Sequence, residues 1–152
     1  MWYDIQDREK LFNNNSLGIA INQDKEKRIF LLDGPSGCGK TDFINHFAGG
    51  KMLRVPSNLI KETVFYSNDI RYNMELMLYF LTQLNLDIMC IEDIDITIER
   101  SDAVQELFAN IVSWLSKRYK VLLTGIEISR VNKTFMECLP DQYRYFMHSD
   151  TV

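Results

Sequence analysis

The sequence has few cysteines and few histidines for its 152 residues: three of the former and two of the latter. Cys38, Cys90 and Cys138 lie about fifty residues apart and form no C-x-x-C pair. This spacing predicts neither a disulfide framework nor a zinc site. His46 and His148 are the available imidazoles, so a metal cluster built from cysteine and histidine is not expected.

The sequence also lacks a long apolar run. Its most apolar region, residues 74–91, is interrupted by five polar or charged residues: Glu75, Thr82, Gln83, Asn85 and Asp87. A membrane span needs about 20 predominantly apolar residues, so none is predicted. The N-terminal residues show neither the basic start nor the apolar stretch of a signal peptide. We therefore expect a cytoplasmic protein.

An excess of positive charge is absent as well. Lysine and arginine number 17 against 21 aspartates and glutamates, which gives a net charge of -4. Extensive contact with a nucleic-acid backbone needs clustered cations, so little direct DNA binding is expected, although a small basic patch remains compatible with this composition. Hydrophobic residues make up 46% of the chain, as in ordinary globular proteins. The length predicts one domain over residues 1–152.

Strand and helix patterns alternate along the chain. Strands are predicted at residues 28–33, 52–55, 87–91, 121–125 and 145–148. Helices are predicted at residues 16–25, 40–48, 57–65 and 70–85, with a further amphipathic helix that begins at Ser101 or Asp102. Ser57 is the expected cap of the helix over residues 57–65. This alternation predicts an α/β fold in which helices cover both faces of a mostly parallel sheet.

The most specific pattern is a glycine-rich segment between the first strand and the helix that follows it. It reads Gly34, Pro35, Ser36, Gly37, Cys38, Gly39, Lys40 and Thr41, which is a phosphate-binding loop of the Walker A type. Glycines let the backbone N–H groups curl around a phosphate, and the positive end of the helix completes the cradle. We expect Lys40 to reach the β- and γ-phosphates and the Thr41 hydroxyl to ligate magnesium. A glycine-rich turn without a ligand would not explain the Lys40-Thr41 pair.

An acidic pair follows a buried strand about fifty residues later, in the sequence Ile-Met-Cys-Ile-Glu-Asp that ends at Asp93. In a nucleoside triphosphate site, one such carboxylate holds the hydration shell of magnesium and the other orients the attacking water. We assign Glu92 to the metal and Asp93 to the water. The alternative is that both acids are solvated side chains beyond a strand end.

Thr124 lies near the end of the next buried strand, where its hydroxyl could bind a γ-phosphate or the attacking water. A hydroxyl that satisfies backbone groups at a strand end is almost as good an interpretation. Both interpretations remain open at this stage.

The order of these motifs resembles the AAA+ ATPase domain of the bacterial replication initiator DnaA and its relative Hda over nearly the whole chain. The segment that begins at Phe12 and Asn13 is similar to the one that contacts adenine in that family. Residues 90–95 resemble its Walker B segment, and residues 121–124 resemble its sensor 1 strand. The resemblance implies a three-layer P-loop sandwich with a five-stranded sheet in the order 5-1-4-3-2.

The chain also departs from the family pattern. Glu92 replaces the usual first aspartate, and Gly125 and Ile126 replace a polar pair after the sensor threonine. Gln142 stands at the position of the family's arginine finger, with Arg144 two residues further on. The residues that remain after this point are too few for a helical lid or a DNA-binding domain.

The resemblance implies a domain that binds ATP or ADP with Mg²⁺ and acts in DNA replication initiation or its regulation. Its expected partners are the nucleotide and other replication proteins or AAA+ subunits, with no membrane. Hydrolysis to ADP and phosphate is expected to be slow, because the lid is missing and the finger is altered. A nucleotide-responsive interaction module without turnover remains an alternative. A small-molecule kinase is a weaker one, since Arg130 and Lys133 are the only basic residues between Ile126 and Tyr143.

Overall fold

The computed structural model describes residues 2–5, 16–23, 28–35, 37–47, 50–65, 68–94, 101–126, 128 and 133–148. Within them lies a six-stranded sheet whose neighbouring strands are all parallel. The strands are β1 (Trp2–Ile5), β2 (Ile29–Asp33), β3 (Met52–Pro56), β4 (Ile88–Glu92), β5 (Lys120–Gly125) and β6 (Tyr143–Met147). Their spatial order is β1-β6-β2-β5-β4-β3.

The five strands predicted from the sequence correspond to β2 through β6, and their order of 5-1-4-3-2 is confirmed. β1 extends this sheet beyond β6 and was not predicted. It pairs in register from Trp2 with Arg144 to Ile5 with Met147. Four residues are too few to show the alternation by which a strand is recognised, even though tryptophan, tyrosine and isoleucine all favour strands.

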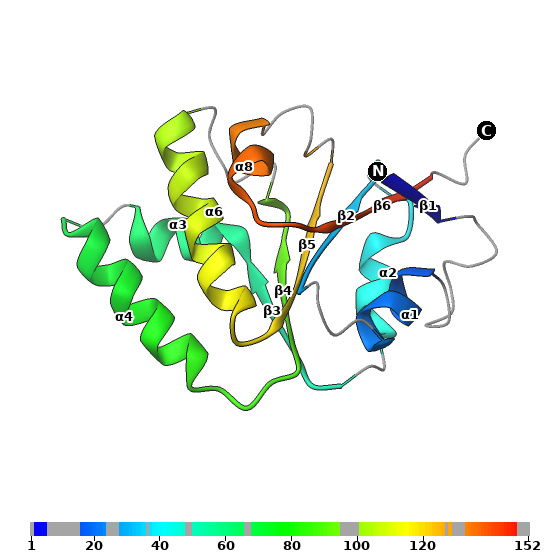
Figure 1. Ribbon diagram of the computed structural model, residues 1–152, viewed down its shortest axis with the longest axis horizontal. Helices are drawn as coiled ribbons and strands as arrows, with labels where there is room; N and C mark the ends of the chain where they lie inside the picture. Colours follow the sequence, from blue (N-terminus) through cyan, green and yellow to red (C-terminus); the bar gives the residue numbers. More distant parts are fainter. Residues whose placement is uncertain are drawn as a thin grey trace.

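Six described helices cover the two faces of the sheet (Figure 1). They are α1 (Ser16–Gln23), α2 (Lys40–Asn45), α3 (Ser57–Val64), α4 (Ile70–Thr82), α6 (Asp102–Ser116) and α8 (Lys133–Cys138). One apolar cluster lies under α1 and α2, and a larger one lies under the other four helices. The predicted three-layer α/β sandwich is therefore confirmed. None of the described helices is long and apolar enough to cross a membrane.

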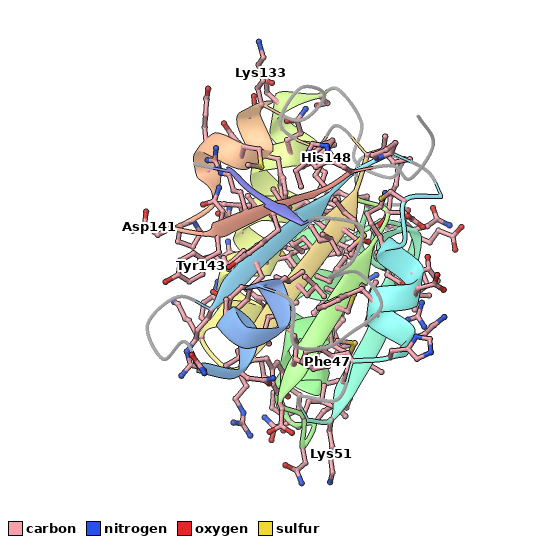
Figure 2. The ribbon with its side chains drawn as sticks, turned by 90° about the vertical axis from the view of Figure 1, so that its right-hand side faces the viewer. Phe47, Lys51, Lys133, Asp141, Tyr143 and His148 are labelled. Atoms are coloured by element: carbon pink, nitrogen blue, oxygen red, sulfur yellow. The ribbon has the colours of Figure 1, made fainter. Side chains whose placement is uncertain are left out.

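The central strands are apolar except near their ends, because helices cover both faces of the sheet. In β2, Ile29 and Leu31 pack into the larger cluster, whereas Phe30 and Leu32 pack toward α1 and α2. Phe30 stacks on Tyr143 of β6 with ring centroids 5.6 Å apart. Figure 2 shows this face of the sheet, with α1 and α2 in front of the strands.

One of the two predicted helix caps differs in the structure. Pro56 is the N-cap of α3, so Ser57 is the first helical residue rather than the cap. Ser101 does occupy the N-cap of α6, but its side chain makes no capping hydrogen bond. The carboxylate of Asp69, in contrast, accepts a 3.0 Å hydrogen bond from the Tyr72 amide at the start of α4. As the first residue inside α3, Ser57 directs its hydroxyl elsewhere, as described below.

Candidate phosphate-binding site

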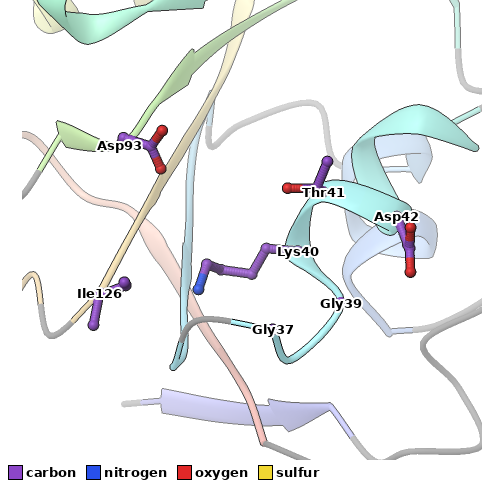
Figure 3. A pocket seen from close by; sticks show the side chains of 7 residues that line it. All are labelled: Gly37, Gly39, Lys40, Thr41, Asp42, Asp93 and Ile126. Carbon is purple, nitrogen blue, oxygen red and sulfur yellow. The ribbon is translucent and has the colours of Figure 1, made fainter.

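The predicted site residues meet at the edge of the sheet where the parallel strands have their carboxyl ends. β2 ends at Asp33, β4 ends at Glu92, and β5 ends at Gly125. A cavity of about 320 Å³ opens there between the loop after β2 and the end of β4. It is lined by Gly37, Gly39, Lys40, Thr41, Asp42, Asp93 and Ile126 (Figure 3).

Glycine is required in the loop by two different features of the backbone. Gly37 and Gly39 have φ angles of 79° and 108°, which side-chain-bearing residues rarely adopt. Gly34 instead lies in a crowded place: an added Cβ atom would collide with the carbonyl oxygen of Met147 and lie 2.8 Å from the Cys38 sulfur. Gly39 is also the N-cap of α2, so the loop leads directly into the positive end of that helix.

The Lys40 ammonium folds back over the start of the loop. Its Nζ atom donates to the carbonyl oxygen of Pro35 at 3.0 Å and to that of Gly34, and it lies 3.8 Å from the Cys38 sulfur. Figure 3 shows Lys40 and Thr41 on the side of the loop that faces Asp93, whereas Asp42 points away from Lys40. The positive charge and the threonine hydroxyl therefore share one cavity with a carboxylate.

Asp93, which lines this cavity, is held in place by hydrogen bonds to its backbone amide and carbonyl groups. Its amide donates to the Thr124 hydroxyl at 3.3 Å, and its carbonyl oxygen accepts from the Ser57 hydroxyl at 2.9 Å. Its φ angle of 60° lies in the left-handed region, which aspartate tolerates better than most residues. These two neighbours, from β5 and α3, fix a conformation that costs about 1 kcal/mol or more by itself.

Glu92 has a different environment, although it precedes Asp93 directly. Alternation along β4 places it on the face of Cys90, which packs in the same cluster as α2. Its carboxylate forms a 2.6 Å ion pair with the guanidinium of Arg54 on β3, which also donates to Asn45 at the end of α2. The hydrogen bond that Arg54 donates to Glu92 raises the pKa of Arg54. Glu92 is not among the residues that line the cavity.

Thr124 is buried, and its hydroxyl accepts the hydrogen bond of the Asp93 amide. This contact is the one expected for a hydroxyl that satisfies backbone groups at a strand end. Ile126, two residues later, contributes an apolar side chain to the cavity. Phe12, Asn13 and Ser36, which the sequence assigned to nucleotide binding, lie outside the described residues.

Three residues at this site were not found by sequence reasoning: Asp33, Arg54 and Ser57. Asp33 is buried, and its carboxylate accepts from the Gly34 amide at 2.8 Å. A charged residue at the end of an otherwise apolar strand, directly before the loop, was the available signal. No pattern in the sequence indicated that Arg54 would pair with Glu92 or that Ser57 would hold Asp93, because both contacts join distant segments.

The architecture of this chain is similar to that of solved structures. No protein-family model matches the sequence, and no curated protein matches it. Solved structures do match: the Orc1 protein of Aeropyrum pernix in complex with DNA superposes with a TM-score of 0.58 and 15% identity over 86% of this chain. A katanin structure described for its self-assembly gives 0.52 and 17% over 80% of this chain. A DNA replication initiation factor gives 0.51 and 11% over 84% of this chain.

These structural neighbours are AAA+ proteins. The chain has the AAA+ fold. At identities of 11 to 17%, the likeness shows this fold alone. The chain spans 41 to 44% of the length of these neighbours. Within the AAA+ fold, the loop after β2 and the ends of β4 and β5 occupy the edge where ligands bind in open parallel sheets.

Proposed function

We propose that this chain is an ATP-binding, DnaA-like AAA+ domain that acts in DNA replication initiation or its regulation. The observation that carries the proposal is the meeting of Lys40, Thr41 and Asp93 in one cavity, at the start of a helix and beside a glycine-rich loop. The loop amides, the helix end and the Lys40 ammonium favour an anion, and the AAA+ fold makes a nucleoside triphosphate the natural ligand.

The same residues fit a magnesium ion. Thr41 and Asp93 offer oxygen donors on the two sides of the cavity, which suits a hard cation that keeps several waters and shares phosphate oxygens. No group of three histidine, cysteine, aspartate or glutamate side chains comes together in the part of the chain that the structure describes, so the nucleotide would complete the coordination. Bound magnesium would neutralise charge on the phosphates. Glu92, the acid predicted to hold the metal, would first have to leave Arg54 or act through its second oxygen.

Within this proposal, Asp93 orients the attacking water and hydrolysis is slow. Thr124 supports Asp93 through the backbone, which leaves Asp93 as the polar side chain opposite Lys40. Ile126 places an apolar side chain where a polar residue could have held the water. The geometry therefore also favours the second candidate, a nucleotide-responsive interaction module in which binding, rather than turnover, is the output.

The role in replication is supported by the neighbours, two of which are described as an Orc1 protein in complex with DNA and a DNA replication initiation factor. We propose other replication proteins or AAA+ subunits as partners, since the katanin structure is described for self-assembly. Gln142 and Arg144, at the predicted finger position, lie at the amino end of β6. Neither residue lines the cavity, so we propose that a finger here would serve a neighbouring subunit.

The test of nucleotide binding is Lys40→Ala, with Lys51→Ala as its control. Both changes remove one lysine charge, but Lys51 is exposed and directly precedes β3, at the other edge of the sheet. Hydrogen bonds to charged groups contribute about 1.5–3 kcal/mol, so we expect Lys40→Ala to weaken ATP binding at least about tenfold in calorimetry. ATP with magnesium should also raise the melting temperature of the unmodified chain. Equal affinities in the two variants would contradict the proposal.

A further inference from the structure

Asp33 has an unusual position for a carboxylate. It is the last residue of β2, its side chain is 2% exposed, and the four residues before it are all apolar. One carboxylate oxygen accepts a 2.8 Å hydrogen bond from the Gly34 amide, and the other accepts a 3.0 Å hydrogen bond from the Ile128 amide. Burying a charge is costly unless it is hydrogen-bonded, so these bonds are what makes an aspartate tolerable here.

The two amides belong to two segments that also contribute residues to the lining of the phosphate cavity. Gly34 begins the glycine-rich loop, whereas Ile128 follows β5 two residues after Ile126, which lines the cavity. Alternation along β2 places Asp33 on the same face as Leu31, which is opposite to the face that α1 and α2 cover. The carboxylate thus joins segments that are 95 residues apart in the chain.

The far side of Gly34 leaves little room for movement. The Met147 carbonyl oxygen and the Cys38 sulfur both lie where a Cβ atom of residue 34 would be. The loop is therefore fixed at its first residue by a carboxylate on one side and by close backbone contact on the other. Without the carboxylate, the Gly34 and Ile128 amides would each lose an acceptor in a buried place.

We propose that Asp33 is a positioning residue that fixes the phosphate loop to the segment after β5 and thereby sets nucleotide affinity without touching the nucleotide. This inference rests on the proposed function of the cavity. Its physical basis is preorganisation: a loop already held in its binding conformation loses less conformational freedom when the phosphates bind. The segment after β5 contributes because it carries Ile126 at the opposite wall.

The experiment compares Asp33→Asn and Asp33→Ala with Gln105→Ala. Gln105 is the matched control because it is also buried, at 3% exposure, and its side-chain oxygen accepts the Phe135 amide at 3.0 Å. That bond ties α6 to α8 and does not involve the cavity lining. Two measurements are made well below the melting temperature: ATP affinity by calorimetry, and hydrogen exchange of residues 34–41 and 126–128 without nucleotide.

We expect Asp33→Asn to weaken ATP binding by about tenfold, since the amide keeps one acceptor and loses the other, and Asp33→Ala to weaken it further. Hydrogen exchange should rise in both segments of these variants. Gln105→Ala should lower the melting temperature while leaving affinity within about twofold and both exchange rates unchanged. If Asp33→Ala does not fold, Asp33→Asn alone decides the outcome.

Unchanged affinity in Asp33→Asn would overturn the inference, and so would an equal loss in Gln105→Ala. If the unmodified chain binds no ATP, the proposed function fails. The exchange experiment still tests the positioning role in that case, because it needs no nucleotide. A rise in only one of the two segments, or in neither, would show that Asp33 does not couple them.

Discussion

At the residue scale, the two neighbouring acids of the site are separated by geometry more than by sequence. Asp93 leaves the strand with a φ angle of 60° and lines the cavity, whereas Glu92 stays in β4 and pairs with Arg54 at 2.6 Å. Chemically similar side chains at successive positions thus have different neighbours. Variants of the two acids should therefore behave differently.

We predict that Asp93→Asn leaves ATP affinity nearly unchanged and lowers any hydrolysis by about a hundredfold or more, because the amide fills the same space but cannot accept a proton. Glu92→Gln should instead weaken the dependence of ATP binding on magnesium. Binding is measured by calorimetry with and without magnesium, and turnover by phosphate release. Hydrolysis by Asp93→Asn at the rate of the unmodified chain would remove Asp93 from the proposed role.

The sequence predicted this site unevenly, and the reason is the range of the interactions. The loop of residues 34–41 is a local pattern, so its glycines, Lys40 and Thr41 were predicted from their spacing alone. Ser57 and Asp93, in contrast, lie 36 residues apart and meet only because β3 and β4 are neighbours. Asp33 and Ile128 meet across 95 residues. Such contacts depend on topology, which periodicity does not specify.

At the scale of the element, strand order was predicted better than element ends. β2, β4 and β5 form continuous apolar runs that are buried by helices on both faces, and this signal is strong. Helix starts were predicted to within about one residue, but helix caps were less well predicted, because a serine near a helix start does not have to cap it. Ser57 lies inside α3, and Ser101 caps α6 by position only.

The difference between Asp69 and Ser101 gives a prediction about stability. Asp69 accepts the Tyr72 amide at 3.0 Å at the start of α4, whereas the Ser101 side chain makes no such bond at the start of α6. Asp69→Ala should lower the free energy of unfolding by about 1 kcal/mol, and Ser101→Ala should change it much less. Denaturant unfolding of both variants measures this. A larger loss for Ser101→Ala would show that the two caps are assigned the wrong way round.

At the scale of the whole molecule, the negative net charge makes duplex DNA an unfavourable binding partner. The chain has a net charge of -4 and no evident basic recognition element. We predict weak and salt-sensitive binding to duplex DNA at most, since affinity for the phosphate backbone requires neutralisation by clustered cations. Fluorescence anisotropy with duplexes of different sequence, at low and at physiological salt, tests this. Submicromolar, sequence-specific binding at physiological salt would contradict it and assign a direct DNA contact to this domain.

The predicted finger is not among the residues that line the phosphate cavity of its own molecule. β6 runs parallel to β2, and Arg144 pairs with Leu31, three residues before Gly34, where the loop that follows β2 begins. With its amide suitably oriented, Gln142 accepts from the Arg144 guanidinium at 3.1 Å, so the guanidinium lies beside the residue that precedes β6. We propose that an arginine held in this way serves a nucleotide in another subunit.

This geometry predicts complementation between subunits. Arg144→Ala should bind ATP as tightly as the unmodified chain, because Arg144 does not line the cavity of its own molecule, but should hydrolyse it more slowly in any assembly. Lys40→Ala should bind ATP poorly while keeping its arginine. A mixture of the two variants, at a concentration where the chain assembles, should release phosphate faster than either alone, since one supplies the loop and the other the arginine.

Each variant at the same total concentration is the control. If Arg144→Ala by itself retains the full rate, Arg144 is not the finger, and charge on the transferred phosphate is stabilised by another group or by a partner protein.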